Sequence, residues 1–350
     1  MRIAVLGAGA IGAVSAALAA SRGHEVAIVA PRGAPRLGQA GGGRLAFRCA
    51  GGFAWEGEVT LLDGIAALAD WPVILLATPG DAYPAVLPAL QAVLRPGQTV
   101  ICSGALSLAP LWLAERTPAE VVAWGTTLGT ARILPDRSVQ VGTLRGRFEQ
   151  AALPAARAEA LLALTHALFG DHVVPVDSLL VPLLSNINPI AHAGQVIPNL
   201  SRIEQGEPWQ LFANFRETGA RIAGAIDAER IAVAAAFGVE VRSLARHYHL
   251  SYHVPEGSIA EIAAAIEAAG RGPRGPASLV HRYTEEDIPF GLVVYETLGA
   301  MAGVPTPNLT AAITLLCCAT GRPFRTLNPL LGELELDGCS PAELLRRCAG

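Results

Sequence analysis

The chain has 350 residues, of which 51% are hydrophobic and 16% are charged, and its formal net charge is −4. This length and apolar content suffice for two domains with buried cores and argue against a disordered chain. No run of basic residues provides the positive surface that nucleic-acid binding requires, so we expect small-molecule partners and no nucleic acid.

The basic residues are unusual, because all 26 are arginine and none is lysine. No lysine can therefore act as a general acid or form a Schiff base, and guanidinium does not release its proton near neutral pH. Arginine does suit the recognition of carboxylates, since its planar group donates two parallel hydrogen bonds.

The chain begins with a glycine-rich turn between a predicted strand, residues 2–6, and a predicted helix, residues 11–20. The motif Gly7-Ala8-Gly9-Ala10-Ile11-Gly12 in this context predicts dinucleotide binding. Gly7 permits the tight turn, Gly9 lets the backbone approach the pyrophosphate, and Gly12 allows close helix packing. Ala10 and Ile11 begin the helix whose N-terminus faces the phosphate charge.

The uncharged stretch at residues 3–20 reaches the length of a minimal membrane span or a signal peptide. Its glycines instead divide it into the strand and the helix, so we expect no membrane segment. The six cysteines lack metal-ligand spacing, which predicts reduced core residues, no metal site and a cytoplasmic location.

The loop after a second predicted strand, residues 25–29, bears on the choice of cofactor. NAD-specific enzymes usually carry an acidic residue there for the ribose hydroxyls, whereas this chain reads Ala30-Pro31-Arg32, with Arg36 nearby. These arginines would favour a 2′-phosphate, so the predicted cofactor is NADP, with NAD as the alternative. The other interpretation is that both arginines are solvated loop residues.

Further predicted strands cover residues 72–77, 99–102, 121–127, 139–144 and 172–174, with a helix over residues 154–169 before the last strand. Thr78 follows the first of these strands, at an end that lines a cofactor crevice. The alternation predicts an α/β fold with a Rossmann doubly wound parallel sheet over residues 1–175.

From residue 176 the pattern changes to long apolar helical periodicities, over residues 176–204, 209–237 and 289–302. Residues 176–350 are therefore predicted to form a mostly α-helical second domain. The oligomeric state stays open, and a homodimer is compatible with the sequence.

Segments of this second half read LSNINPIAHA at residues 184–193, NLSRIE at 199–204, DAER at 227–230, AAFG at 235–238 and HRYTEEDIPFGL at 281–292. This set resembles the octopine/nopaline (opine) dehydrogenase family. The resemblance implies an NAD(P)H-dependent condensation of an amino acid with a 2-oxo acid, with pyruvate expected, through an imine that is reduced to a secondary amine.

The resemblance also implies residue roles. His192 falls on the acid/base position, Asp287 on the position that orients it, and Arg282 on the position that holds a substrate carboxylate. The segment from Thr126-Thr127 to Arg132 resembles a crevice-lining segment, although Thr126 stands where many members carry glutamate. Thr127 and Arg132 are thus candidate substrate contacts. Asn188 is a further candidate that could hydrogen-bond substrate or cofactor.

Simpler interpretations remain for these residues. A histidine in an apolar helix is commonly a hydrogen-bonded core residue, and Asp287 before Ile288-Pro289 has the pattern of a helix N-cap. The alternative functions are a ketopantoate-reductase-like 2-oxo acid reductase and a catalytically silent NADP-binding sensor. The first typically uses a lysine, which this chain lacks.

Overall fold

The structure is a computed structural model that describes residues 1–33 and 35–350. The described residues form two compact units, Met1–Leu183 with Leu345–Gly350, and Leu184–Leu344. The division differs from the predicted one between residues 175 and 176. Most of the helix α5 (Leu180–Leu184) belongs to the first unit, and the end of the chain returns there, since Leu179 N–H donates to the Cys348 carbonyl over 2.9 Å.

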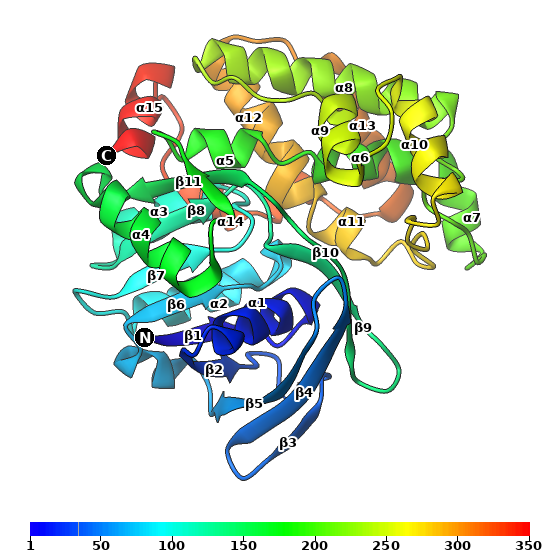
Figure 1. Ribbon diagram of the computed structural model, residues 1–350. Helices are drawn as coiled ribbons and strands as arrows, with labels where there is room; N and C mark the ends of the chain where they lie inside the picture. Colours follow the sequence, from blue (N-terminus) through cyan, green and yellow to red (C-terminus); the bar gives the residue numbers. More distant parts are fainter. Residues whose placement is uncertain (34) are drawn as a thin grey trace. The chain divides into compact units, whose positions relative to one another are not determined.

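The first unit is built on one mixed sheet in the order β12-β11-β8-β7-β6-β1-β2-β5-β4-β10-β9, with β3 paired to β4 (Figure 1). The strands are β1 (Arg2–Leu6), β2 (Glu25–Val29), β3 (Gln39–Gly41), β4 (Arg44–Gly51), β5 (Trp55–Leu62), β6 (Val73–Leu76), β7 (Thr99–Cys102), β8 (Glu120–Trp124), β9 (Gly129–Ile133), β10 (Val139–Leu144), β11 (Phe148–Leu153) and β12 (Val173–Pro175). From β8 to β5 all neighbouring pairs are parallel. The predicted Rossmann sheet is confirmed.

The sheet is larger than predicted, because antiparallel pairs extend it on both sides. β4 pairs with β5, β11 with β8, and β9 with β10 in antiparallel fashion. In β4 the buried residues Leu45, Phe47 and Cys49 alternate with exposed ones, as expected for a strand with one solvated face. The added strands make the sheet mixed, with the parallel Rossmann strands at its centre.

The helices that follow strands of this sheet include α1 (Ala10–Ser21), α2 (Tyr83–Gln91), α3 (Ala109–Arg116) and α4 (Ala158–Phe169). α1 packs against β1, β2 and β5, and it also contacts α4. Its buried face consists mainly of alanine and glycine, which lets the helix lie close to the strands. This close packing holds the N-terminus of α1 at the carboxyl end of β1.

The second unit is helical, as predicted. Its helices are α6 (Asn188–Val196), α7 (Leu200–Glu204), α8 (Glu217–Ala236), α9 (Leu244–Tyr252), α10 (Ile259–Ala268), α11 (Arg282–Glu285), the π-helix η5 (Ile288–Leu292), α12 (Val293–Ala302), α13 (Pro307–Thr320) and α14 (Pro329–Glu333), and α15 (Pro341–Ala349) crosses back to the first unit. α8 contacts α6, α10, α12 and α13 (Figure 1).

The predicted helix over residues 209–237 begins later than expected, at Glu217. Trp209 donates its indole N–H to the Pro276 carbonyl, and Gln210 forms an antiparallel bridge with Arg274. These long-range bonds replace the helical ones over the first eight residues of the predicted span.

The cysteines only partly match the expectation of core residues. Cys49, Cys102 and Cys348 are buried, Cys317 and Cys339 are half-buried, and Cys318 is exposed; none of these six described cysteines forms a disulfide. Burial raises the pKa of Cys49 to about 11 and that of Cys102 to about 12. Along residues 1–33 and 35–350, no helix is long and apolar enough to cross a membrane.

Candidate active site

The turn between β1 and α1 requires glycine at two of its positions. A Cβ on Gly7, which has φ +131°, would lie 2.5 Å from the Ala77 carbonyl oxygen. A Cβ on Gly12 would lie 1.9 Å from the Gly7 carbonyl oxygen. A Cβ on Gly9 would meet nothing within 4 Å, so the turn is packed against backbone at Gly7 and Gly12 and open at Gly9.

The N-terminus of α1 offers backbone donors at this open side. Gly9 is the N-cap and provides no side chain to cap the helix, and the hydrogen bond from Ala13 N–H to the Gly9 carbonyl measures 2.9 Å. The N–H groups of Ala10, Ile11 and Gly12 precede that bond, so they have no acceptor within the helix. Such a terminus suits an anion such as a pyrophosphate.

Two hydroxyl groups at neighbouring strand ends fit the same ligand. Thr78 follows β6 and Ser103 follows β7, and within the described residues both hydroxyl oxygens are buried without a hydrogen-bond partner. β6 pairs with both β1 and β7 in parallel, so these carboxyl ends share one edge of the sheet. Buried hydroxyls without partners are costly unless a polar ligand satisfies them. Thr78 was predicted as a cofactor contact from the sequence.

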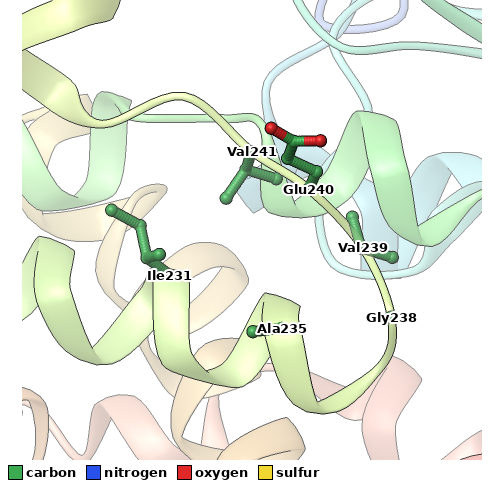
Figure 2. Close-up of a pocket in the computed structure, with 6 residues that line it drawn as sticks. All are labelled: Ile231, Ala235, Gly238, Val239, Glu240 and Val241. Carbon is green, nitrogen blue, oxygen red and sulfur yellow. The ribbon is translucent and has the colours of Figure 1, made fainter.

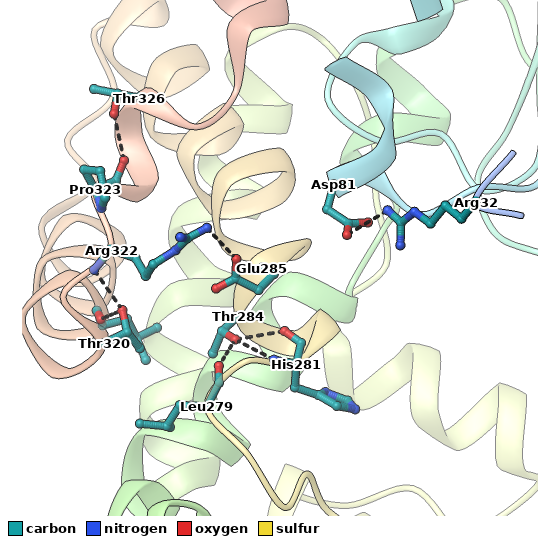
Figure 3. A network of polar contacts seen from close by, with 11 residues as sticks. Arg32, Asp81, Leu279, His281, Thr284, Glu285, Thr320, Arg322, Pro323 and Thr326 are labelled. Carbon is teal, nitrogen blue, oxygen red and sulfur yellow. Dashed lines mark hydrogen bonds and ion pairs between the residues drawn. The ribbon is translucent and has the colours of Figure 1, made fainter. Parts of the chain in front are cut away.

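Arg32 is exposed after β2 and forms an ion pair that the sequence analysis missed. Its Nη2 lies 2.9 Å from Oδ2 of Asp81, in the short turn after Thr78 (Figure 3). Arg36 is also exposed. In the sequence, only the closeness of Asp81 to Thr78 indicates a place near the cofactor. Its contact with Arg32, 49 residues away, depends on the order of the strands in the sheet.

In the second unit, His192 and Asp287 meet. His192 lies on α6, and its Nδ1 is 2.6 Å from Oδ2 of Asp287. The two residues are buried, with 9% and 2% of their surfaces exposed. A buried carboxylate on Nδ1 fixes the tautomer that donates from this nitrogen, which leaves Nε2 to exchange protons. Such an arrangement is capable of acid/base chemistry.

The structure decides between two interpretations of Asp287. The residue occupies the N-cap position of the π-helix η5, as the pattern with Pro289 predicted, but its side chain makes no capping hydrogen bond. The carboxylate bonds to His192 instead. The simpler interpretation of Asp287 as a capping residue therefore does not describe its side chain.

Aromatic and charged side chains of α11 surround this pair. The ring of Tyr283 stacks on that of His192, with centroids 3.5 Å apart and planes inclined by 14°. His281 meets Tyr283 edge-on at 4.7 Å, and burial, followed by the charges of Arg282 and His192, lowers its pKa to about 4. His281 is therefore neutral near pH 7.

Arg282 is half-exposed, and its Nε lies 3.4 Å from Oε2 of Glu286. The Glu286 carboxylate raises the pKa of Arg282 above its ordinary value. Only one guanidinium nitrogen is used in this ion pair, at a distance longer than a strong hydrogen bond. The group can therefore accept a second carboxylate partner.

The remaining candidates have local partners. Asn188 begins α6, and its backbone N–H donates to Oδ1 of Asn186 over 3.1 Å. Thr127 donates its hydroxyl to the Gly129 carbonyl over 2.9 Å, and Arg132 is exposed on β9. Asn188 belongs to the second unit with His192, whereas Thr127 and Arg132 belong to the first.

Two pockets lie away from the candidate residues. One of about 290 Å³ is at the end of α8, and Figure 2 shows the residues that line it: Ile231, Ala235, Gly238, Val239, Glu240 and Val241. Another of about 530 Å³ lies over β4 and β5. Within residues 1–33 and 35–350, no three His, Cys, Asp or Glu side chains gather as metal ligands would.

The chain is similar to known proteins along both units. Residues 175–320 match the family described as NAD/NADP octopine/nopaline dehydrogenase, alpha-helical domain. An opine dehydrogenase of Arthrobacter sp. (strain 1C) is 31% identical over 284 residues, which cover 79% of this chain and 78% of that protein. This chain belongs to the opine dehydrogenase family. It is thus an NAD(P)-dependent dehydrogenase.

Solved structures agree on the fold of this chain. An octopine dehydrogenase with NADH and L-arginine matches with a TM-score of 0.74 at 17% identity, covering 100% of this chain and 96% of that one. A yersinopine dehydrogenase with bound NADP+ matches at 0.73 and 17% identity over 98% and 95%. A ketopantoate reductase from Ralstonia eutropha JMP134 gives 0.64 at 18% identity over 91% and 98%.

The segment that matches the family description contains both members of the buried pair, His192 and Asp287, as well as Tyr283. The glycine turn lies outside that segment, in the first unit. The family match of residues 175–320 thus covers the helical unit, whereas the similarity to the Arthrobacter protein extends into the first unit.

Proposed function

We propose that this chain condenses the amino group of an amino acid with the carbonyl group of a 2-oxo acid, pyruvate, and reduces the resulting imine with NADPH. The observation that carries the proposal is the buried hydrogen bond of 2.6 Å between His192 and Asp287. Reductive condensation needs protons to move at two stages, and a buried imidazole with a fixed tautomer suits that task.

The reaction balances as follows. The amine nitrogen adds to the carbonyl carbon to give a carbinolamine, which loses water to form the imine; a hydride on the imine carbon and a proton on its nitrogen complete the secondary amine. The turn from Gly7 to Gly12, together with Thr78, would hold NADPH, which would provide the hydride when bound. His192 removes a proton from the attacking amine and returns one to the departing hydroxyl.

Asp287 holds the tautomer in which Nδ1 of His192 carries a proton, and its negative charge stabilises the imidazolium that forms during each transfer. The carboxylate is 2% exposed, so water screens this interaction little. No lysine is available for the same role, because the chain contains none.

Arg282 is the proposed ligand of the 2-oxo acid carboxylate. Its side chain is half-exposed, and its contact with Glu286 leaves most of the guanidinium donors available. Thr127, Arg132 and Asn188 are proposed as further substrate contacts, on the resemblance to the family alone.

The preference for NADP over NAD is proposed from the loop after β2. It carries Arg32 and Arg36 and no acidic residue that would repel a 2′-phosphate. Arg32 is exposed and its ion pair with Asp81 is exposed as well, so a phosphate can replace that carboxylate at little cost.

A simple reduction of the 2-oxo acid is the second candidate, because the fold also matches a ketopantoate reductase. The test is a matrix of amino acids against 2-oxo acids, followed by NADPH absorbance. We expect oxidation only where both substrates are supplied, and mass spectrometry should find the N-(carboxyalkyl) amino acid. Equal oxidation with the oxo acid alone would favour the second candidate, and no oxidation in any combination would favour a silent cofactor-binding protein.

A further inference from the structure

We propose that Tyr283 is a positioning residue that sets the plane of the His192 ring and supports its charged form. The inference rests on the proposed function, in which His192 transfers protons. It adds a third member to the pair of His192 and Asp287, one that acts on the face of the imidazole rather than on its edge.

One hydrogen bond does not determine the orientation of an imidazole ring. The bond from Nδ1 to Asp287 fixes the position of that nitrogen, but the ring can still tilt about the line that joins the two residues. A stacked ring at 3.5 Å and 14° removes this tilt, because any rotation drives the imidazole into the phenol face. The two contacts together direct Nε2 to one place, which proton transfer requires.

Tyr283 is itself held by the local structure of α11. His281 caps this helix and accepts a hydrogen bond from the Tyr283 backbone N–H, while their rings meet edge-on at 4.7 Å. Thr284, which is 2% exposed, donates its hydroxyl to the His281 and Leu279 carbonyls (Figure 3). A buried hydroxyl thus anchors the residue next to Tyr283.

A second anchor holds the end of α11. Glu285 accepts a hydrogen bond of 2.7 Å from Arg322, which follows α13 (Figure 3). The short helix is therefore tied at both ends within the second unit, and the ring between these ties has little freedom. This rigidity makes Tyr283 a suitable support for another side chain.

The stack also has an electrostatic consequence. The faces of a phenol ring are electron-rich, and an imidazolium placed over such a face is stabilised. His281 is the other imidazole against Tyr283, and it meets the ring edge-on. The Asp287 carboxylate lies at the edge of the His192 ring and the Tyr283 phenol lies on its face, so both contacts favour a positive charge on the imidazole.

The hydroxyl of Tyr283 could itself supply protons, so the experiment must distinguish this role of the hydroxyl from the stacking role of the ring. Burial raises the pKa of this phenol to about 12, so it stays protonated near neutral pH. A role for the hydroxyl predicts that Tyr283→Phe is inactive. A role for the ring predicts that Tyr283→Phe is active and that non-aromatic replacements are not.

The experiment compares Tyr283→Phe, Tyr283→Leu and Tyr283→Met in opine synthesis. We expect near-normal kcat for the phenylalanine variant and a loss of about 10²-fold for the other two, the usual effect of misplacing a catalytic group. NADPH binding should stay normal in all three, because the cofactor turn lies in the other unit. Methionine fills the volume of the ring but has no planar face. If the leucine variant does not fold, the methionine variant still tests the loss of the aromatic ring.

A spectroscopic signature tests the stack without activity. NMR of protein with labelled histidine should show His192 ring protons shifted upfield by the Tyr283 ring in the wild type and in Tyr283→Phe, and not in Tyr283→Leu. Phe237→Leu, which removes another buried ring of the second unit, is the matched control and should keep kcat and the shift.

Three results would overturn the inference: normal kcat in both non-aromatic variants, loss of kcat in Tyr283→Phe, or an equal loss in Phe237→Leu. Inactivity of the wild-type chain with every substrate pair would instead contradict the proposed function, and the NMR shift would then still test the stack.

Discussion

Nδ1 of His192 lies 2.6 Å from Oδ2 of Asp287, although 95 residues separate them in the chain. Asp287 stands immediately before the π-helix η5, and Leu292 N–H donates to its carbonyl over 2.9 Å, the wide spacing of a π-turn. Such turns are frequent at functional sites, because they turn a side chain away from the regular helical direction. Here the carboxylate is turned toward α6.

Replacement of Asp287 by asparagine should keep the size of the side chain and remove its charge. We expect kcat for opine synthesis to fall by about 10²–10⁴-fold, the range for the loss of acid/base catalysis. His192→Ala should fall by a similar factor, and the double variant should lose little more, because the two residues act together. NADPH titration by fluorescence is the control and should show normal binding. Turnover at the wild-type rate in either single variant would refute the assignment.

Gly9 and Gly12 should respond differently to alanine. In Gly12→Ala the new Cβ would overlap the Gly7 carbonyl oxygen, so we expect destabilisation by about 1–3 kcal/mol or more. In Gly9→Ala the Cβ has space, and the cost should not exceed about 1 kcal/mol, that of a poorer N-cap.

The Gly9 variant should instead lose cofactor affinity, because its methyl group lies where the pyrophosphate approaches. Loss of one charged hydrogen bond corresponds to about 1.5–3 kcal/mol, or roughly 10- to 100-fold in Kd. Urea unfolding of the cofactor-free protein and NADPH titration separate the two effects. Normal NADPH binding by Gly9→Ala would argue against a phosphate at this turn.

Variants of Arg32 and Asp81 test the contact with the 2′-phosphate from both sides of the ion pair. Arg32→Ala should weaken NADPH binding by roughly 10- to 100-fold, since a charged hydrogen bond is lost, and should leave NADH nearly unchanged. Asp81→Asn should release Arg32 and strengthen NADPH binding by only about 2- to 5-fold, because an exposed ion pair contributes about 0.2–1 kcal/mol. Titrations at low and high salt measure both, and equal losses for NADPH and NADH in Arg32→Ala would exclude a 2′-phosphate contact.

His281 should make stability depend on pH. Its pKa is about 4 in the folded chain, against 6.5 for an unperturbed histidine. As pH falls from 6.5 toward 4, the unfolded chain binds a proton that the folded chain excludes, so the free energy of unfolding decreases; below pH 4 this decrease ends.

The matched variant is His281→Asn, which keeps an acceptor for the Tyr283 N–H and does not titrate. Urea unfolding between pH 4 and 7 should show a shallower dependence for this variant than for the wild type. The titration of carboxylates changes the free energy of unfolding equally in the wild type and in the variant. Parallel curves would mean that His281 titrates normally.

Local sequence determined much of this protein. The glycine turn, β1, β2, β7 and β10 were predicted with their observed bounds or nearly so, because short-range spacing and apolar periodicity specify them. The change from strands to helices and the motifs around His192 and Asp287 likewise indicated a helical second unit and the opine dehydrogenase family. The absence of lysine excluded a class of mechanisms from composition alone.

Tertiary structure decided the rest. β4 and β5 were missed because their polar faces weaken the apolar signal, and only pairing in the sheet stabilises them. Asp81 meets Arg32 through the order of the strands, which short-range patterns do not contain. The orientation of Asp287 toward His192, and the stacking of Tyr283 on that ring, depend on the packing of α6 against η5 and α11, whose residues are about 90 positions apart in the chain. Local patterns specify which elements form, whereas contacts between distant segments decide which side chains meet.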